Sequence, residues 1–490
     1  MSAPPISALN FDEVPARWAA GAAPRVNPVL TSGCLLATDL LAIGGALLLG
    51  IALWQMVNPG VTSQNYPDVW AVAGLMIAVY HLFGLYSPVA LNPAEELRKI
   101  VQGSLLVCLV IAAGIFLSKD AAVMSRGIYV TSGALTCLLV PICRAATRRL
   151  FGRRRWWGVP VILLGAGTTA RELIASLQER PGFGMKPVAC LDDNPAKLGA
   201  CCGVPVVGPL SAAAEAANAF RARHAVIAMP ELSRERLVRV LGENAAVFRN
   251  VIVIPNLFGM ASLWVTACEL GGALGLEVRQ NLLAPVNRWL KRAMDIALGG
   301  AFGLLAIPVV AVAGIWIKLA SAGSVFYTQE REGEAGATIR VRKLRTMHRN
   351  ADELLTRHLE DCPAALGEWL RYCKLRNDPR IVPGVGRLLR RSSLDELPQL
   401  WNVLKGEMSL VGPRPFPRYH LDQFDPEFRS LRTRVKPGLT GLWQVSARND
   451  GDLGVQKVLD TYYIRNWSLW LDLHILARTA KAVLFAKGAY

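Results

Sequence analysis

Charged residues are scarce in this chain, and its cysteines form no paired motif. Only 19% of the 490 residues are Asp, Glu, Lys or Arg, whereas 52% are hydrophobic. Disordered nucleic-acid binders are rich in charge and poor in apolar residues, so the composition excludes that class and predicts no nucleic-acid partner. The ten cysteines include no Cys-x-x-Cys pair, which argues against a disulfide framework and a zinc site.

Acidic residues are fewer than basic residues in this chain. Lys and Arg total 54 against 37 Asp and Glu, which gives a net charge of +17. A basic chain with long apolar runs is typical of an integral membrane protein whose cytoplasmic parts carry the positive charge. The sequence therefore predicts a membrane protein rather than an ordinary soluble enzyme, with its cysteines present as reduced thiols.

Four apolar stretches precede residue 150, and they span residues 29–56, 69–85, 100–117 and 127–143. Each is near or above the roughly 17–20 residues that a helix needs to cross a bilayer. The link between the first two has no Lys or Arg, whereas six Arg lie between residues 144 and 155. The positive-inside rule then predicts a cytoplasmic tail at 1–28, four crossings within 29–150 and a cytoplasmic location for the rest, and the six Arg outweigh Lys119 and Arg126 in the third link.

Asp39 lies inside the first predicted span, where a carboxylate is a candidate functional group. Its position near the cytoplasmic end favours a structural role instead, because there it reaches interfacial water or caps a neighbour. The four stretches show no polar stripe that would line a transport path. The region is therefore predicted to be a docking or dimerising anchor, with a homodimer as a candidate assembly.

A different pattern begins after residue 150. Residues 159–178 read as a buried strand, a glycine turn and a helix, and residues 186–194 read as a second strand that ends in acids. Two later strand-like runs, at 224–230 and 250–255, fit a small parallel sheet. These features predict a Rossmann-like α/β domain at residues 151–280.

The glycine turn of that domain leaves several interpretations open. Gly165, Gly167 and Ala170 have the spacing of a dinucleotide-binding turn, and Asp192 lies far enough on to meet a ribose hydroxyl. The same turn is also what tight strand–helix packing requires with no ligand. A scaffold role leads, and a nucleotide site at Gly165, Gly167 and Asp192 is the alternative. Redox catalysis is a weaker alternative still, because nothing nearby resembles a Tyr-x-x-x-Lys pair.

A fifth apolar run spans residues 296–317 without a charge, and its length alone would make it another span. Pro308 sits in the middle, where it removes a helical hydrogen bond. Both flanks are basic, whereas a crossing helix has one flank poor in Lys and Arg. We therefore expect a re-entrant helix–break–helix that enters the inner leaflet and returns; a full span with a proline kink is the alternative.

Carboxylates and cations concentrate near the C-terminus, and Asp395 and Glu396 stand at the centre. Neighbouring residues on a helix point about 100° apart, so this pair cannot share one proton. The pair is better suited to two separate roles, in which one carboxylate is a nucleophile and the other binds a divalent cation. The apolar residues around the pair fall on one helical face, a stripe suited to the membrane surface: Leu394, Leu397, Leu400, Trp401 and Leu404.

Cations from other segments add to this centre. Arg414 is held in a proline-framed loop at 412–415, which suits it to present a guanidinium to phosphate. The further candidates for binding phosphate are Arg390, Lys343, Arg345 and Arg448. Together with the buried re-entrant helix they predict a site for two anionic substrates.

At these residues the chain resembles a known family. Four motifs, which begin at residues 291, 390, 410 and 436, carry the resemblance: Lys-Arg-x-x-Asp-Ile, Arg-x-Ser-Ser-Leu-Asp-Glu-Leu-Pro-Gln-Leu, Leu-Val-Gly-Pro-Arg-Pro and Lys-Pro-Gly-Leu-Thr-Gly-Leu-Trp-Gln-Val-Ser. In combination they resemble the bacterial polyprenyl-phosphate hexose-1-phosphate transferases, the monotopic phosphoglycosyl transferases. The whole layout is similar to the long form of that family, with departures at Ala447, where many relatives have Gly, and at Ile307-Pro308, where many have Ser-Pro.

The resemblance implies a fold in three parts. They are a membrane α-helical N-terminal bundle, a Rossmann-like α/β middle domain, and a mostly α-helical catalytic domain at 281–490 with a re-entrant membrane helix at 296–317. The implied location is the bacterial inner membrane, with several crossings and a cytoplasmic catalytic domain.

The resemblance also implies a ping-pong reaction. Asp395 would attack the β-phosphate of a UDP-hexose, expel UMP and hold the sugar phosphate, which undecaprenyl phosphate would then accept. Glu396 would hold Mg²⁺, and Arg390 and Arg414 would grip phosphate oxygens, with Arg448 a weaker candidate. Galactose is slightly favoured over glucose as the hexose. The product would begin an O antigen, a capsule or an exopolysaccharide.

Two other functions stay open at this point. One is a membrane-anchored nucleotide-sugar oxidoreductase that uses the Gly165 turn, and the other is a non-enzymatic scaffold for polysaccharide assembly. Replacing Asp395 with Asn separates both from the transferase, since only the transferase needs that carboxylate to release UMP.

Overall fold

The computed structural model describes residues 26–58, 69–118, 126–197, 199–245, 247–254, 265–270, 273–278, 281–362, 366–367, 375, 378–417, 421, 424–446 and 453–484. The chain forms two compact units, Met1–Leu257 and Phe258–Tyr490. The first holds a helical bundle and an α/β sheet. The second holds the segments predicted to be catalytic.

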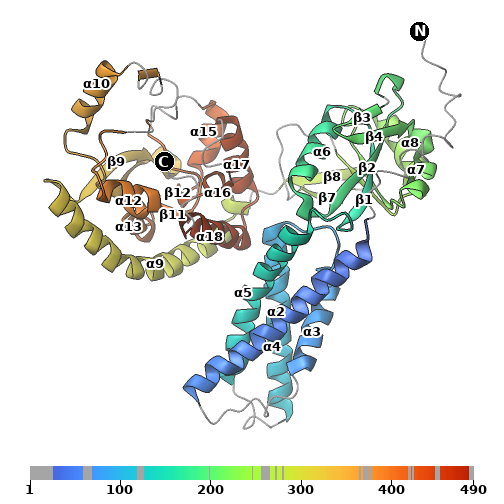
Figure 1. Cartoon of the computed structure of the whole chain (residues 1–490), viewed down its shortest axis with the longest axis horizontal. Helices are drawn as coiled ribbons and strands as arrows, with labels where there is room; N and C mark the ends of the chain where they lie inside the picture. The colour runs from blue at the N-terminus through green and yellow to red at the C-terminus, as the bar shows by residue number, and fades with distance from the viewer. Residues whose placement is uncertain are drawn as a thin grey trace. The chain divides into compact units, whose positions relative to one another are not determined.

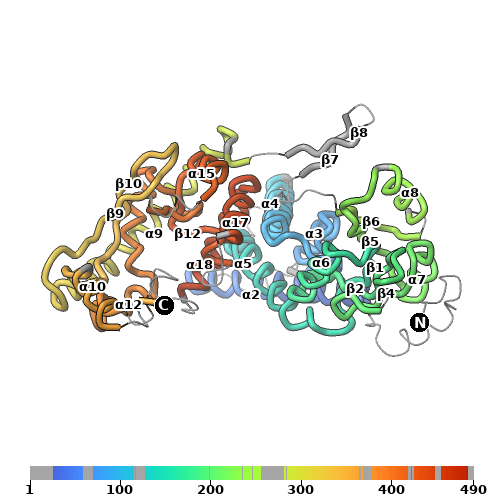
Figure 2. Tube along the Cα trace, turned by 90° about the horizontal axis from the view of Figure 1, so that it is seen from above, coloured from blue at the N-terminus to red at the C-terminus, as the bar shows by residue number. Residues whose placement is uncertain are grey.

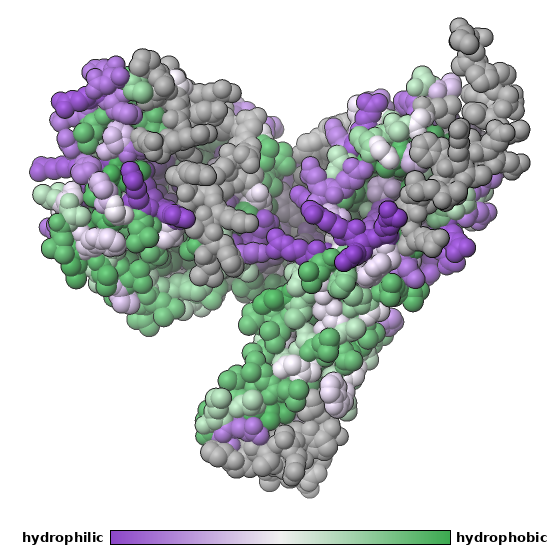
Figure 3. All heavy atoms as spheres, in the orientation of Figure 1, coloured by the Kyte–Doolittle hydropathy of each residue, from purple (hydrophilic) through white to green (hydrophobic). Residues whose placement is uncertain are grey.

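The bundle of the first unit consists of α2 (Pro28–Val57), α3 (Val69–Leu82), α4 (Pro93–Ser118) and α5 (Arg126–Phe151). These helices confirm the positions of the four predicted apolar stretches (Figure 1), and hydrophobic side chains cover the visible face of the bundle (Figure 3). Helices α2, α4 and α5 are long and apolar enough to cross a membrane. Helix α3 has 14 residues, fewer than the roughly 20 of a span. It ends earlier than predicted, because Gly84 takes a φ of 70° in the turn that follows Leu82.

Asp39 is buried in this bundle and pairs with Arg144 of α5. Arg144 Nε donates to Asp39 Oδ1 over 2.8 Å, and its Nη1 donates to Glu96 Oε1 over 2.8 Å. The same Nη1 lies 3.0 Å from the Leu85 carbonyl, and Arg148 Nη2 donates to Glu96 Oε1 over 2.8 Å. A buried charge is costly unless it is paired and hydrogen-bonded. The network therefore ties α2, α4 and α5 together and favours the structural role predicted for Asp39.

The α/β part of the first unit is a six-stranded sheet in the order β3-β4-β2-β1-β5-β6. Its strands are β1 (Val159–Leu164), β2 (Met185–Leu191), β3 (Gly199–Cys201), β4 (Val204–Gly208), β5 (His224–Ile227) and β6 (Asn250–Val253). All neighbours pair in parallel except β3 and β4. The two later strands predicted from the sequence are β5 and β6, and both are confirmed.

Helices cover both faces of this sheet, as Figures 1 and 2 show. Helix α6 (Thr168–Glu179) packs on one face, where Leu163 and Cys190 are buried against it. Helices α7 (Ala213–Ala219) and α8 (Arg234–Ala245) pack on the other face, against the alternate residues of the same strands. A mostly parallel sheet with helices on both faces is the α/β architecture predicted for this part of the chain.

The backbone conformation of the turn between β1 and α6 requires glycine. Gly165 has a φ of 103°, and a Cβ there would lie 2.4 Å from a methionine side chain, so the position requires glycine. Gly167 precedes the first turn of α6. Asp192, just after β2, accepts hydrogen bonds from the Ala166 N–H (2.8 Å) and from Lys197 Nζ (2.9 Å). These contacts tie the turn to the end of β2, and a nucleotide site at this turn stays a prediction.

The second unit is mostly helical, as predicted (Figure 1). Its helices are α9 (Pro285–Ala320), α10 (Ala351–Asp361), α12 (Val385–Ser392), α13 (Gln399–Lys405), α15 (Pro426–Thr433), α16 (Leu442–Ser446), α17 (Leu453–Arg465) and α18 (Leu469–Leu484). Its strand pairs are β7 (Val265–Leu270) with β8 (Ala273–Val278), β9 (Phe326–Glu332) with β10 (Thr338–Leu344), and β11 (Ser409–Val411) with β12 (Gly438–Thr440). The last pair is parallel, and the other two are antiparallel.

Helix α9 contains the position at which a break was expected. It runs for 36 residues without interruption through Pro308 and curves along its length (Figure 1). The helix–break–helix is therefore corrected to one continuous, bent helix. A proline removes one backbone hydrogen bond and bends a helix, while the bonds on either side hold the helix together. By length and composition α9 is able to cross a membrane, and its re-entrant path stays a prediction.

Charged residues at the start of α9 fasten it to the rest of the second unit. Arg292 donates through Nη1 and Nη2 to the last carbonyls of α13, 2.7 Å each. Asp295 Oδ1 accepts from the Ser409 hydroxyl (2.9 Å) and from the N–H that follows it (3.0 Å). Lys291 Nζ donates to the buried Asp472 over 2.7 Å. The Lys-Arg-x-x-Asp motif is thus a structural clamp in this unit.

Candidate active site

Asp395 and Glu396 lie on a short 3₁₀ turn, η8 (Leu394–Glu396), between α12 and α13. Ser393, directly before the turn, has φ 56° and ψ 19°. This left-handed conformation is uncommon for a residue other than glycine, and such positions often lie at active sites. It ends α12 and turns the chain, so that the two carboxylates stand on a corner rather than within a long helix.

The apolar stripe predicted around the carboxylates is divided by this corner. Leu397, Leu400, Trp401 and Leu404 line a groove beside α9. Leu394 packs instead against the core formed by β10, α12 and α9. The expectation of one continuous helical face is therefore correct from Leu397 onward and wrong at Leu394.

Strand β10 delivers Lys343 to Glu396. Side chains alternate along a strand, so Lys343 shares a face with the buried Ile339 and Val341. Its Nζ lies 2.7 Å from Glu396 Oε1. Arg414 Nη2 lies 3.6 Å from the same oxygen. Within the part of the chain that the structure describes, both of these cations pair with Glu396.

Arg390, in the last turn of α12, lies near Asp395 and is oriented by Thr346. Its Nε donates to Thr346 Oγ1 over 2.9 Å. Burial lowers the pKa of Arg390, and the nearby charge of Asp395 raises it. No sequence pattern points to Thr346, which lies two residues after the end of β10. Lys343, Arg390 and Arg414 are the predicted cations that the structure brings to the carboxylates.

Burial, with a smaller contribution from the charge of Glu396, raises the pKa of Asp395 to about 6. The cations Lys343 and Arg390 act in the opposite direction. A carboxyl group with this pKa is mostly ionised at pH 7, yet it is less well solvated and more basic than an exposed aspartate. Both properties favour attack on phosphorus. Of the two acids, Asp395 therefore fits the nucleophile and Glu396 fits the cation-binding group.

Backbone contacts fix the loop that carries Arg414. The loop follows β11, and its Gly412 N–H donates to the Thr440 carbonyl over 2.8 Å. The Gly438 N–H donates to the Pro413 carbonyl over 2.9 Å. A Cβ on Gly438 would lie 2.0 Å from the Gly412 nitrogen, so the two backbones approach closely enough to require glycine.

Arg432 of α15 supports this loop by a bond to its backbone, and no sequence pattern points to this residue. Its side chain is buried, with 8% of the residue exposed, and its guanidinium donates to the Arg414 carbonyl. Its Nε lies 3.5 Å from Asp460 Oδ2. The guanidinium carbon lies 4.9, 5.2 and 5.6 Å from the ring centroids of Phe416, Phe424 and Phe428. One Arg in a helical pattern gives no sequence signal for such a cage.

One predicted phosphate ligand, Arg345, has its hydrogen bonds elsewhere. Arg345 donates to the Ser321 and Ala322 carbonyls over 2.8 and 2.7 Å. It therefore satisfies carbonyls at the C-terminal end of α9, which corrects the expectation that it faces phosphate. Arg448 lies outside the described residues.

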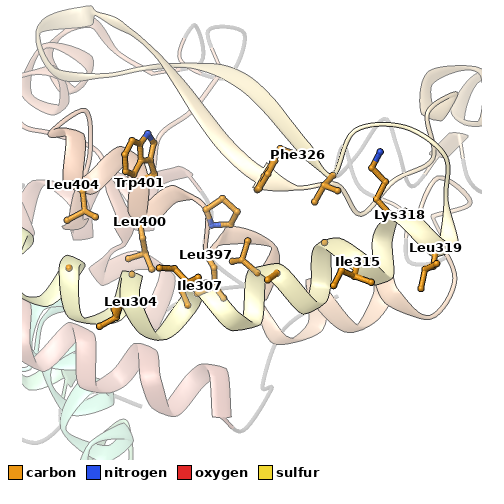
Figure 4. Close-up of a pocket in the computed structure, with 18 residues that line it drawn as sticks. Leu304, Ile307, Ile315, Lys318, Leu319, Phe326, Leu397, Leu400, Trp401 and Leu404 are labelled. Carbon is orange, nitrogen blue, oxygen red and sulfur yellow. The ribbon is translucent and has the colours of Figure 1, made fainter.

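A groove of about 960 Å³ lies between α9 and the η8–α13 segment (Figure 4). Leu304, Ile307 and Ile315 come from α9, and Leu400 and Trp401 come from the opposite wall. The volume is at the upper end of the 300–1,000 Å³ or so that ligand pockets commonly have. The wall opposite α9 includes Leu397, the residue that directly follows Glu396 in the chain.

The carboxylate oxygens of Asp395 and Glu396 on η8 suit a divalent cation that is bound together with a substrate. Among the described residues, no three His, Cys, Asp or Glu side chains converge. Mg²⁺ is commonly held by one or two carboxylates and takes its other ligands from substrate phosphates and water. Glu396, with Asp395 beside it, fits that arrangement.

Two family models match the chain. The model described as bacterial sugar transferase matches residues 286–486, and the model described as CoA-binding domain matches residues 81–255. The first match includes Asp395, Glu396 and the cations around them. The second includes all six strands of the sheet.

Among the curated relatives that match over most of the chain are three named sugar transferases. The UDP-galactose-lipid carrier transferase of Erwinia amylovora is 34% identical, over 81% of this chain and 82% of the relative. The undecaprenyl-phosphate galactose phosphotransferase of Salmonella typhimurium is 35% identical, over 75% of this chain and 76% of the relative. The UDP-glucose:undecaprenyl-phosphate glucose-1-phosphate transferase of Escherichia coli is 31% identical, over 89% of this chain and 93% of the relative.

Proposed function

The chain belongs to the bacterial sugar transferases that act as polyprenyl-phosphate hexose-1-phosphate transferases, and from this premise we propose a two-step mechanism with Asp395 as the nucleophile. The donor is a UDP-hexose, the acceptor is undecaprenyl phosphate, and UMP is released after the first step. The observation that carries the proposal is the corner at η8, where a partly buried carboxyl with a pKa of about 6 lies beside a second acid that is paired with two cations.

In the first step, a carboxylate oxygen of Asp395 forms a bond to the β-phosphorus of the donor. The bond from that phosphorus to the bridging oxygen breaks, and UMP leaves with the electron pair. In the second step, an oxygen of the acceptor phosphate attacks the same phosphorus, and the carboxylate of Asp395 leaves. The reaction exchanges one phosphoanhydride for another, so it depends on positioning and charge neutralisation more than on driving force.

The cations around the turn supply that neutralisation. Arg414 is held on a loop fixed by its backbone, and its planar guanidinium suits two oxygens of a phosphate. Lys343 balances the charge of Glu396, so that an anionic donor can approach the two acids. Arg390 lies on the Asp395 side and is oriented by Thr346. Mg²⁺ held by Glu396 would supply further neutralisation of the diphosphate.

We assign the catalytic unit to the cytoplasmic side of the inner membrane. The support is the cluster of six Arg between residues 144 and 155, directly after the fourth apolar stretch. For the hexose we slightly favour galactose over glucose, since the two relatives named for galactose are 34% and 35% identical to this chain and the glucose transferase of Escherichia coli is 31% identical. The product would be the first membrane-bound intermediate of a surface polysaccharide.

The test is UMP release by the purified full chain from a panel of UDP-sugars, with undecaprenyl phosphate present. We expect release from UDP-galactose and its loss in Asp395→Asn. Glu330→Gln, an exposed acid on β9, serves as the matched control and keeps activity. Full activity of Asp395→Asn would remove the proposed nucleophile. Loss on substitution of Gly165 together with retention in Asp395→Asn would favour the oxidoreductase instead.

A further inference from the structure

A small polar pocket lies at the start of α9, and the acids of η8 are not part of it. Its volume is about 160 Å³, and six of the nine described residues that line it are charged: Arg288, Lys291, Arg292, Asp295, Glu334 and Lys436. Among the described residues, it shares none with the apolar groove. The volume exceeds what one buried water needs but is below the roughly 300 Å³ of the smallest common ligand pockets. The pocket therefore fits a small ion or a single chemical group.

Two of the four cations in this pocket are paired with acids. Lys291 Nζ donates to the buried Asp472 over 2.7 Å, and Arg288 forms an ion pair with Glu334. Lys436 differs from both. Within the part of the chain that the structure describes, no acid and no carbonyl pairs with its ammonium group. The pocket thus holds a cation whose charge the protein does not balance.

The fourth cation, Arg292, lies close to Lys436 at the end of α13. A Cβ on Gly406, the residue that ends this helix, would lie 3.3 Å from the guanidinium carbon of Arg292 and 3.5 Å from Lys436 Nζ. Arg292 donates to two carbonyls of the last turn of α13, whose partial negative charge offsets only part of its own. Two cations so close together repel each other unless an anion lies between or beside them.

The buried Asp295 does not serve as that anion. Its Oδ1 accepts hydrogen bonds from the Ser409 hydroxyl over 2.9 Å and from the next backbone N–H over 3.0 Å. Among the described residues, it forms no ion pair with Lys436. The carboxylate is therefore engaged with β11, and the position beside Lys436 stays open to a ligand.

Exposed apolar side chains lie on the same first turns of α9. Val286 and Trp289 are 77% and 79% exposed. Trp beside a long apolar helix is typical of the membrane–water interface, and α9 is long and apolar enough to cross a membrane. Phospholipid phosphates lie at that interface. The start of α9 is therefore expected at a level where phosphate groups are abundant.

We propose that this pocket binds a phosphate group through Lys436, with Arg292 and Arg288 beside it. A phosphate group fits the size of the pocket, and its charge balances the cation that the protein leaves unpaired. The inference does not depend on the proposed function, because none of the described residues that line the pocket takes part in the proposed reaction. The group has two sources, the headgroup of a bilayer phospholipid and soluble phosphate.

The test measures thermal unfolding of the full chain, purified in detergent and stripped of lipid, while inorganic phosphate is added at constant ionic strength. Lys436→Met removes the ammonium group and keeps most of the side-chain volume. Lys405→Met is the matched control, because Lys405 is an exposed lysine directly before Gly406 that does not line the pocket. Arg414→Met removes a cation from the acids, where the phosphates of the reaction are proposed to bind.

We expect phosphate to raise the unfolding midpoint of the wild-type, Lys405→Met and Arg414→Met proteins. In Lys436→Met the apparent affinity for phosphate falls by about tenfold or more, because a hydrogen bond to a charged group is lost. Phosphate also stabilises folded proteins in general, and the comparison of variants removes this common effect.

Gly406→Asn is the second variant, and it removes no charge. Gly406 has a φ of 86°, a left-handed conformation that Asn tolerates at the end of a helix. The new side chain occupies the space next to Lys436 and Arg292. We expect it to weaken phosphate binding as Lys436→Met does. A cooperative transition without phosphate shows that each variant is folded, and Gly406→Asn decides the test if Lys436→Met has none.

Reconstitution in nanodiscs of phosphatidylethanolamine and phosphatidylglycerol separates the two sources. If a headgroup occupies the pocket, the wild-type protein in nanodiscs no longer responds to added phosphate. Native mass spectrometry of the protein released from them then detects a phospholipid that Lys436→Met does not retain. If the pocket takes soluble phosphate, the response persists in nanodiscs.

Three results would overturn the inference. The first is equal stabilisation by phosphate of the wild-type protein, Lys436→Met and Gly406→Asn. The second is a response lost in Arg414→Met and kept in Lys436→Met, which would assign phosphate binding to the acids of η8. The third is a wild-type protein that neither responds to phosphate nor retains a phospholipid.

Discussion

Lys343 Nζ lies 2.7 Å from Glu396 Oε1, and this contact divides the roles of the two adjacent acids. Arg414 Nη2 lies 3.6 Å from the same oxygen. The charge of Glu396 is therefore balanced by neighbours, while burial raises the pKa of Asp395. The two acids therefore have different surroundings. That Asp395 attacks phosphorus and Glu396 holds a divalent cation stays our proposal.

Replacing Lys343 with Met removes the ammonium group and keeps most of the side-chain volume. We expect UMP release to fall about 10²-fold, the usual loss when one charge-stabilising donor is removed from an active site. The rate is measured with saturating UDP-galactose. Arg340→Met on the same strand is the control, because Arg340 is 77% exposed in its side chain and pairs only loosely with Glu330 at 3.7 Å. Equal losses in the two variants would show that the effect is not local to Glu396.

The pH dependence of the first step is predicted from Asp395. Attack needs the ionised carboxyl, whose pKa burial raises to about 6. The kcat/KM for the donor, which reports the free enzyme, is expected to fall about tenfold per pH unit below about pH 6 and to level off above it. Lys343 lowers this pKa, so Lys343→Met moves the acidic limb to higher pH. A limb near pH 4 in the wild-type protein would contradict the raised pKa of the partly buried Asp395.

Arg432 is predicted to position the Arg414 loop. Lys keeps the charge but cannot stack on three rings and donate to the Arg414 carbonyl at once. We expect Arg432→Lys to lower kcat/KM for the donor by about 10–100-fold, as a misplaced phosphate contact does. Arg434→Lys, at an exposed position two residues later, is the control. A matched loss of thermal stability in detergent with no change in kinetics would assign Arg432 to stability alone.

Removal of divalent cations with EDTA is expected to abolish UMP release, and added Mg²⁺ is expected to restore it. Glu396→Gln keeps the size of the side chain and loses its charge. The Mg²⁺ concentration for half-maximal rate should rise by at least about tenfold in this variant, since the loss of even an indirect metal contact has that effect. Wild-type activity in EDTA would exclude a metal requirement and leave neutralisation to Lys343, Arg390 and Arg414.

Much of the fold was predictable from local sequence patterns. Long apolar runs located α2, α4 and α5, because a helix that meets lipid needs such a run. Strand-like runs beside a glycine turn located β1, β5 and β6. The uninterrupted course of α9 through Pro308 agrees with the alternative, a helix with a proline kink, rather than with the expected break, because backbone bonds on both sides of a proline can preserve a helix.

The candidate site was predictable only in part. Motifs placed Asp395, Glu396, Lys343, Arg390 and Arg414 together, and the structure brings these five side chains to one corner. The basic run that contains Lys343 also suggested Arg345 as a phosphate ligand. Arg345 instead lies next to the end of α9 and donates to backbone carbonyls there.

The support given by Arg432 depends on residues from α15, α17 and the loop after β11. A contact among segments so far apart in the chain leaves no local pattern in the sequence. The same holds for Asp39 and Arg144, which lie 105 residues apart and form a buried ion pair.

The central claim is that Asp395 carries the sugar phosphate between the two steps. It is tested most directly by incubating the full chain with UDP-galactose without acceptor, followed by mass spectrometry of its peptides. The account predicts a hexose-phosphate adduct on the peptide that contains Asp395, its absence in Asp395→Asn, and its disappearance when undecaprenyl phosphate is added. Rapid transfer to the acceptor with no adduct at Asp395, or with an adduct on another residue, would contradict it.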